Sequence, residues 1–169
     1  MVFETEYPKI AIIGLGNELL TDDGVGVHAV RELQKEPLTG VLLAEIGTRA
    51  LNAQQLLEEA DIVIAIDAVR ADGPPGSVYL FDSINIETQQ QYSLHDLGII
   101  GVLKLIRKDL RPKLIILGVE PEIIDYGMEL SETVRTTLKS VTGAARKIAE
   151  QIRKTELSNI NLDSLCAQN

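Results

Sequence analysis

The sequence predicts an α/β domain in which helices cover both faces of a mostly parallel, five-stranded sheet, giving a three-layer α/β/α sandwich. Three observations lead to this prediction. Short runs of Val, Ile and Leu without polar alternation recur along the chain, and such runs are typical of parallel strands buried on both faces. Segments with apolar residues at helical spacing separate these runs. The length of 169 residues suits one domain.

Four apolar runs bounded by Gly, Asp or Pro are predicted to form the parallel strands. They occupy residues 9–15, 41–46, 61–68 and 114–119. A fifth predicted strand, residues 77–81, follows the turn Asp-Gly-Pro-Pro-Gly at residues 72–76. Because this turn is too short to contain a crossover helix, the fifth strand should pair antiparallel with a neighbour or lie at an edge of the sheet.

Four helices are predicted between and after the strands, at residues 25–35, 51–59, 93–108 and from the N-cap Ser131 to Thr155. The third opens with Ser-Leu-His-Asp, a capping-box type of start. In the last helix, apolar residues step by four and three and form an amphipathic stripe. We therefore expect an N-terminal extension at residues 1–8, one domain at residues 9–155 and a mobile tail at residues 156–169.

Composition and charge exclude several classes of protein. The formal net charge of −9 argues against nucleic-acid binding and against docking on an anionic membrane. The longest apolar runs are far shorter than the roughly 20 residues that a membrane-spanning helix needs. Cys166 is the single cysteine, so no intramolecular disulfide can form, and the first residues do not resemble a signal peptide. We expect a cytoplasmic protein.

Candidate metal ligands follow two of the predicted strands and begin one predicted helix. Ligands of open α/β sheets bind at the carboxyl ends of strands where the strand order reverses, which we expect between the first and third strands. Asp23 follows the first strand, Asp67 ends the third, and His95 lies at the start of the third helix. Two carboxylates and one imidazole form an incomplete shell for a divalent first-row metal. A helix N-terminus also favours the neutral imidazole that binds metals.

Each of these residues also has a simpler interpretation. Asp22 and Asp23 could cap the following helix, Asp67 could be a turn residue, and His95 could be a surface residue. Gly98 and Gly101 lie three positions apart in the third helix and weaken it, so close packing or a passing peptide could require that face to be bare.

Other catalytic and nucleotide-binding motifs are missing from the sequence. Gly14-Leu-Gly16 begins like a dinucleotide fingerprint, but Leu19 stands where the third glycine belongs. The chain contains no P-loop, no G-x-S-x-G elbow and no H-E-x-x-H motif. A nucleotide-binding α/β domain is therefore the weakest of the functional alternatives.

Four segments resemble the nickel–iron hydrogenase maturation endopeptidases. They are residues 12–26, 64–68, 93–98 and 118–121, and the order and spacing agree over about residues 9–152. Such enzymes remove a short C-terminal extension from the hydrogenase large subunit after nickel has been inserted. The resemblance thus implies that the hydrogenase large-subunit precursor is the partner and that the fold is an α/β/α sandwich with a five-stranded sheet.

The resemblance also implies roles for particular residues. It assigns nickel recognition to Asp23, Asp67 and His95, with the nickel arriving in the substrate. Glu120 lies in the segment 120–129, which resembles the family's loop at this place and is expected to shape the peptide cleft. Gly98 and Gly101 are expected to bind the substrate peptide on the bare helix face described above. Two catalytic mechanisms stay open. The metal polarises the scissile carbonyl or activates water, or a carboxylate, Asp22 or Asp23, acts as a base. A non-catalytic nickel-checkpoint or chaperone module that binds the same precursor is the alternative from another class.

Overall fold

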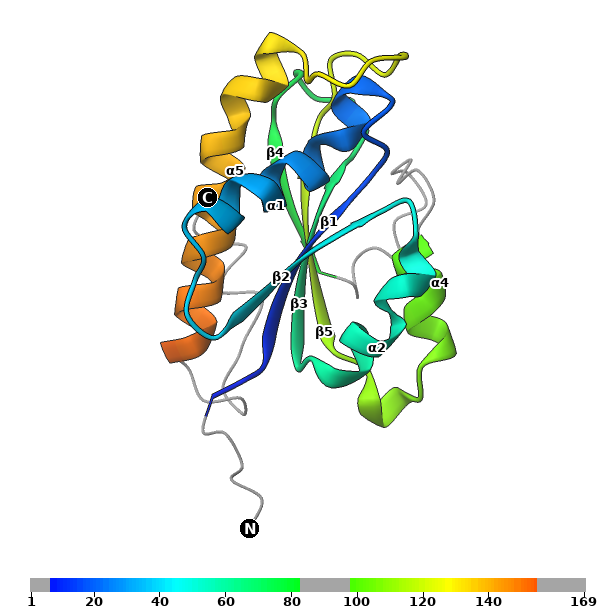
Figure 1. The fold of residues 1–169 in the computed structure, drawn as a ribbon, viewed down its shortest axis with the longest axis vertical. Helices are drawn as coiled ribbons and strands as arrows, with labels where there is room; N and C mark the ends of the chain where they lie inside the picture. Colours follow the sequence, from blue (N-terminus) through cyan, green and yellow to red (C-terminus); the bar gives the residue numbers. More distant parts are fainter. Residues whose placement is uncertain (1–6, 83–97, 155–169) are drawn as a thin grey trace.

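The computed structural model describes residues 7–82 and 98–154, and it confirms the predicted fold class (Figure 1). The strands are β1 (Ile10–Leu15), β2 (Val41–Gly47), β3 (Ile62–Ala68), β4 (Val78–Asp82) and β5 (Lys113–Val119). They form one sheet in the order β2-β1-β3-β5-β4. β1 pairs in parallel with β2 and β3, β3 pairs in parallel with β5, and β4 pairs antiparallel with β5 at the edge. Both expectations for the fifth strand are thus confirmed.

Among the described residues, two α-helices cover each face of the sheet (Figure 1). α1 (Val25–Lys35) and α5 (Glu132–Lys154) lie on one face, and α2 (Gln54–Glu59) and α4 (Gly98–Leu105) lie on the other. Successive strand side chains point to opposite faces, so Ile12 packs in the core under α1 and α5, whereas Ile13 packs in the core under α2 and α4. Because both faces of the sheet are buried, the strands appear in the sequence as unbroken apolar runs. None of the described helices is both long and apolar enough to cross a membrane.

The second predicted helix begins differently from the expectation. Residues Ala50–Ala53 form a 3₁₀ turn (η2), and the α-helix starts only at Gln54. Leu51, an apolar residue at the start of the predicted helix, is 67% exposed, whereas Ala53 and Leu57 are buried. Residues four apart share one face of a helix, as Ala53 and Leu57 do, and Leu51 lies off that face.

The third predicted helix is shorter at its C-terminal end than expected. α4 ends at Leu105 rather than at residue 108, and Lys108–Leu110 form a separate 3₁₀ turn (η3). The guanidinium of Arg111 donates to the carbonyl oxygens of Lys104 and Ile106, at 3.0 and 2.8 Å. These bonds satisfy carbonyls that a continuing helix would have used, which stabilises the early end. The predicted start of this helix at residue 93 lies outside the described residues.

The last helix begins where the sequence predicts. The Ser131 hydroxyl oxygen accepts a hydrogen bond from the Val134 N–H at 3.3 Å, which is the geometry of an N-cap, and α5 starts at the next residue. The predicted tail at residues 156–169, and residues 1–6 of the predicted N-terminal extension, lie outside the described residues.

The N-terminus of α1 packs directly against the backbone of two strands. A Cβ atom on Gly26 would lie 2.0 Å from the carbonyl oxygen of Ile66 in β3 and 2.5 Å from that of Leu15 in β1. Only a glycine allows this approach. The contact fixes how the segment between β1 and α1 lies across the carboxyl ends of the strands.

We expect Gly26→Ala to lower the free energy of unfolding by at least about 3 kcal/mol, because neither the strand backbone nor α1 can move away from the added methyl group. Gly143→Ala is the matched control, since a Cβ on Gly143 in α5 has no neighbour within 4 Å among the described residues. In a helix interior that change should add about 0.5–1 kcal/mol. Urea denaturation monitored by circular dichroism measures both. Equal midpoints for the two variants would contradict the close-contact argument.

Candidate functional site

A crevice lies where the strand order reverses. β2 and β3 flank β1 on opposite sides, so the predicted reversal between β1 and β3 is confirmed. A crevice of about 240 Å³ opens there, and its lining includes Gly16, Asp23, Asp67 and Gly98. The structure thus brings together two of the three predicted metal ligands. The third, His95, lies outside the described residues.

Asp67 and Asp23 interact unfavourably within this crevice. Burial, and then the nearby charge of Asp23, raise the pKa of Asp67 to about 8, although the Ala68 N–H donates to its Oδ1 at 2.9 Å and acts in the opposite direction. A divalent cation between the two carboxylates would remove this repulsion, and oxygen donors suit such a cation. In residues 7–82 and 98–154, His, Cys, Asp and Glu side chains nowhere gather in a group of three or more that could hold a metal. The described residues can therefore supply part of the ligand shell of a metal ion.

The position of Asp23 depends on Gly16. Gly16 has a φ of +105°, and a Cβ there would lie 1.8 Å from the carbonyl oxygen of Asp23. The chain can therefore turn back so that the Asn17 N–H donates to Asp23 Oδ2 at 2.9 Å. Neither Asp22 nor Asp23 caps α1 with its side chain, because Gly24 is the N-cap residue. The capping interpretation of these two acids is thus wrong.

Asp22 points away from this crevice and is fully buried. Its Oδ2 accepts hydrogen bonds from the Glu122 N–H at 2.9 Å, the Ile123 N–H at 2.8 Å and the Ser131 hydroxyl at 2.9 Å. Its Oδ1 accepts from the Ser131 N–H at 2.7 Å. These bonds hold the segment after β5 against the 3₁₀ turn Thr21–Gly24 (η1). The geometry gives Asp22 a positioning task, and its predicted role as a base stays a prediction.

The three predicted substrate-binding residues lie in different surroundings. Glu120 is buried, and its Oε2 accepts from the Ala71 N–H at 2.8 Å and the Tyr79 hydroxyl at 3.0 Å, which holds the turn before β4. Gly98 lines the crevice, and a Cβ there would lie 2.8 Å from that of Ala50. Close packing therefore explains this glycine. Gly101 is exposed, and among the described residues nothing lies within 4 Å of the position of its Cβ.

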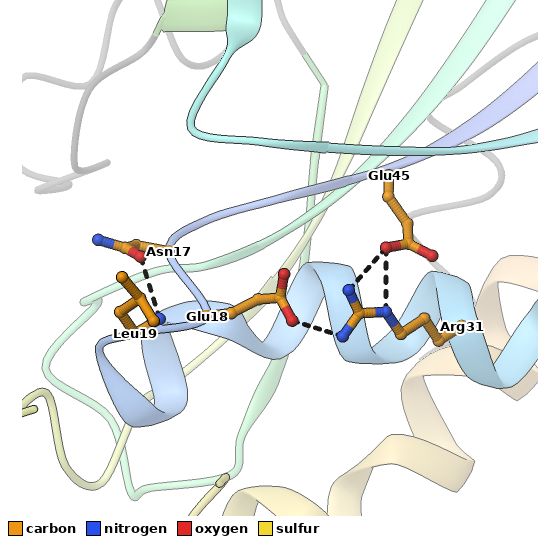
Figure 2. Close-up of polar contacts among 5 residues, drawn as sticks. All are labelled: Asn17, Glu18, Leu19, Arg31 and Glu45. Atoms are coloured by element: carbon orange, nitrogen blue, oxygen red, sulfur yellow. Dashed lines mark hydrogen bonds and ion pairs between the residues drawn. The ribbon is translucent and has the colours of Figure 1, made fainter. Parts of the chain in front are cut away.

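A second, larger crevice of about 460 Å³ adjoins the first over the carboxyl ends of β1 and β2. Arg31 of α1 organises one side of it (Figure 2). Its guanidinium bonds to Glu18 in the loop after β1 and to Glu45 in β2, at 2.8–2.9 Å for Glu45. This network could not be predicted from the sequence, because a helical arginine looks the same in a sequence whether or not it is paired.

We expect Asp22→Asn to lower the free energy of unfolding by about 2–3 kcal/mol, because an amide NH₂ group would face buried N–H donors and leave them unsatisfied. Glu129→Gln, an exposed change on the segment that Asp22 holds, should alter it by less than about 0.5 kcal/mol. Chemical denaturation tests both variants. If the two midpoints shift equally, the clamping role of Asp22 is wrong.

The raised pKa of Asp67 predicts a pH-dependent stability. Between about pH 4 and 8 the folded protein retains a proton on Asp67 that the unfolded chain releases, so the free energy of unfolding falls as pH rises through this range. Asp67→Asn keeps an acceptor for the Ala68 N–H and removes the ionisation. In thermal melts, the melting temperature of this variant should exceed that of the wild type by a margin that grows with pH up to about 8. A constant margin would show that Asp67 ionises normally.

The comparisons with known proteins agree on one family. A family model described as hydrogenase maturation protease matches residues 27–148, which is more than half of the chain. The hydrogenase expression/formation protein HupD of Thiocapsa roseopersicina is 31% identical over 136 residues, which cover 76% of this chain and 62% of that protein. The chain thus spans less than two thirds of this relative.

Solved structures have the same fold. The hydrogenase maturating endopeptidase HybD from E. coli aligns with a TM-score of 0.76 at 26% identity, over 85% of this chain and 93% of that one. The [NiFe] hydrogenase maturation protease HybD from Thermococcus kodakarensis aligns with a TM-score of 0.72 at 32% identity, over 83% and 99%. The chain belongs to the hydrogenase maturation protease family, a family of endopeptidases.

Proposed function

We propose that this protein removes the short C-terminal extension of a nickel–iron hydrogenase large subunit after nickel insertion, and that it recognises nickel held by the precursor. One observation carries the proposal beyond family membership. Asp23 and Asp67 line the crevice at the strand reversal, where burial, and then the nearby charge of Asp23, raise the pKa of Asp67 to about 8. A pair of opposed carboxylates is the arrangement that a divalent cation stabilises.

The donor set suits a metal that arrives with the substrate. Asp23 and Asp67, together with His95 as the resemblance implies, would supply three ligands and leave further coordination positions open. Such an open set binds a free cation less tightly than a closed Cys/His site does. The precursor's own ligands would then complete the shell, so that precursor without nickel would bind poorly. At neutral pH, entry of nickel would displace the proton that Asp67 holds.

Peptide hydrolysis in this crevice needs a water molecule and a group that takes its proton. Among the described residues, one hydrogen bond holds the Asp23 side chain, from the Asn17 N–H to Oδ2. Oδ1 therefore stays available to a metal or to a proton. Asp23 can act as the base if nickel only positions the peptide. If nickel polarises the scissile carbonyl, Asp23 acts as its ligand instead.

A cleavage assay tests the proposal. Nickel-loaded precursor should lose the mass of the C-terminal extension when mixed with the protein, whereas nickel-free precursor should not. Asp67→Ala and His95→Ala should stop the cut with unchanged circular dichroism, because no other group replaces a missing metal ligand. Asp109→Asn, an exposed carboxylate beside Arg107, is the control that should cut normally.

Other outcomes would identify a different function. Binding of nickel-loaded precursor without loss of mass would support the checkpoint or chaperone alternative. Equal cutting of both precursors, or stoichiometric nickel or zinc in protein purified without added metal, would show that the metal is not recognised on the substrate. Normal cutting by both alanine variants would contradict the assignment of the metal ligands.

A further inference from the structure

We infer that the larger crevice binds the precursor segment next to the scissile bond, with an acidic group of that segment at Arg49 and an apolar side chain against Leu19 and Met128. The inference rests on the proposed function and adds the chemistry of the segment that the enzyme selects. We call this crevice the side groove. Its lining includes Leu19, Arg49 and Met128.

The side groove is continuous with the crevice of Asp23 and Asp67. Gly16, Asn17, Gly47 and Thr48 line both. Two of these shared residues are joined through their main chains, since the Gly16 N–H donates to the Gly47 carbonyl oxygen at 3.2 Å. A peptide held at the two carboxylates can therefore continue into the side groove. Its volume of about 460 Å³ lies within the range of binding pockets.

One wall of the side groove is apolar and firmly held. Leu19 and Met128 expose 58% and 64% of their surface, although both are large apolar residues. The Gly127 N–H donates to the Leu19 carbonyl oxygen at 3.0 Å, so the two loops lie side by side, and the Asp22 hydrogen bonds hold the second loop in place. Exposed apolar side chains that adjoin a crevice are typical of a surface that binds a partner.

The charged residues that line the side groove differ in whether they are already paired within the protein. Glu18 and Glu45 share Arg31 (Figure 2), and the hydrogen bond from Arg31 lowers the pKa of Glu18. Arg49 is exposed, and across residues 7–82 and 98–154 its guanidinium makes no hydrogen bond or ion pair. Of the charged lining residues, Arg49 is therefore the one that a ligand can engage without breaking a pair formed within the described part of the chain.

Among the groups of an unmodified polypeptide, a carboxylate is the one that a guanidinium binds best, through two parallel hydrogen bonds. The net charge of −9 disfavours acidic segments over the protein as a whole. An acidic group in the side groove would thus depend on Arg49 itself. The carboxylate can come from an Asp or Glu side chain of the precursor or from its C-terminus.

Steady-state cleavage of nickel-loaded precursor tests the inference. Arg49→Gln and Met128→Ser should each raise KM about five- to ten-fold, and Arg49→Glu should raise it further, with kcat changed less than about two-fold, because these contacts form on binding. The matched controls lie outside the groove. Lys139→Gln removes one positive charge from the surface of α5, and Leu105→Ser changes a leucine that is 68% exposed. Both should leave KM unchanged.

Changes in the precursor identify the source of the carboxylate. In one arm, each Asp or Glu near the cleavage position is replaced by its amide, and in the other a few neutral residues are added after the C-terminus. The change that raises KM for the wild type but not for Arg49→Gln marks the partner of Arg49. Wild-type cleavage with unchanged KM in Arg49→Glu and Met128→Ser would overturn this inference alone. Failure of the wild type to cut would overturn the proposed function and this inference with it.

Discussion

The contact on which the rest of the structure depends is the backbone-to-backbone packing of residues 16–26 against β1 and β3. At Gly26, main-chain atoms of both strands occupy the space in which a side chain would begin, and at Gly16 the main chain of Asp23 occupies that space. This packing seats α1 on the sheet and turns the preceding loop across the carboxyl ends of the strands. Asp23 reaches the crevice of Asp67 only because that loop lies so close. The same packing thus serves the core and the candidate site.

Two successive acids have opposite environments as a consequence. In the tight turn Thr21–Gly24, Asp22 points into the protein and accepts four hydrogen bonds, whereas Asp23 points into the crevice. A buried carboxylate that accepts so many hydrogen bonds organises the main chain around it. Asp22 therefore holds the loop that carries Met128, and the apolar wall of the side groove depends on a residue that does not line that groove.

The fold could be predicted from the sequence because strands that are buried on both faces of the sheet consist of unbroken apolar runs. Ile12 and Ile13 are both apolar since each faces a core, and the short turn before β4 excluded a crossover. The position of Asp67 could be predicted from the end of its strand. The task of Asp22 could not, because its partners Glu122, Ile123 and Ser131 are about a hundred residues away in sequence. The exposure of Leu51 could not be predicted from the sequence either, because a leucine is equally apolar on the buried and the exposed face of a helix.

A site made of opposed carboxylates conflicts with stability. Burial and the charge of Asp23 raise the pKa of Asp67, which means that the fold disfavours the charged form of this group, and ionisation of Asp67 lowers the free energy of unfolding. Groups kept in unfavourable environments persist where the surrounding structure determines their position, and they concentrate at functional sites. Here the surroundings are the glycine contacts of the loop and the hydrogen bonds of Asp22, which keep Asp23 from turning away from Asp67. The rigidity around the crevice therefore keeps the two carboxyl groups close together, so that a cation can take the place of the proton on Asp67, and a flexible loop would lose the site by relaxing.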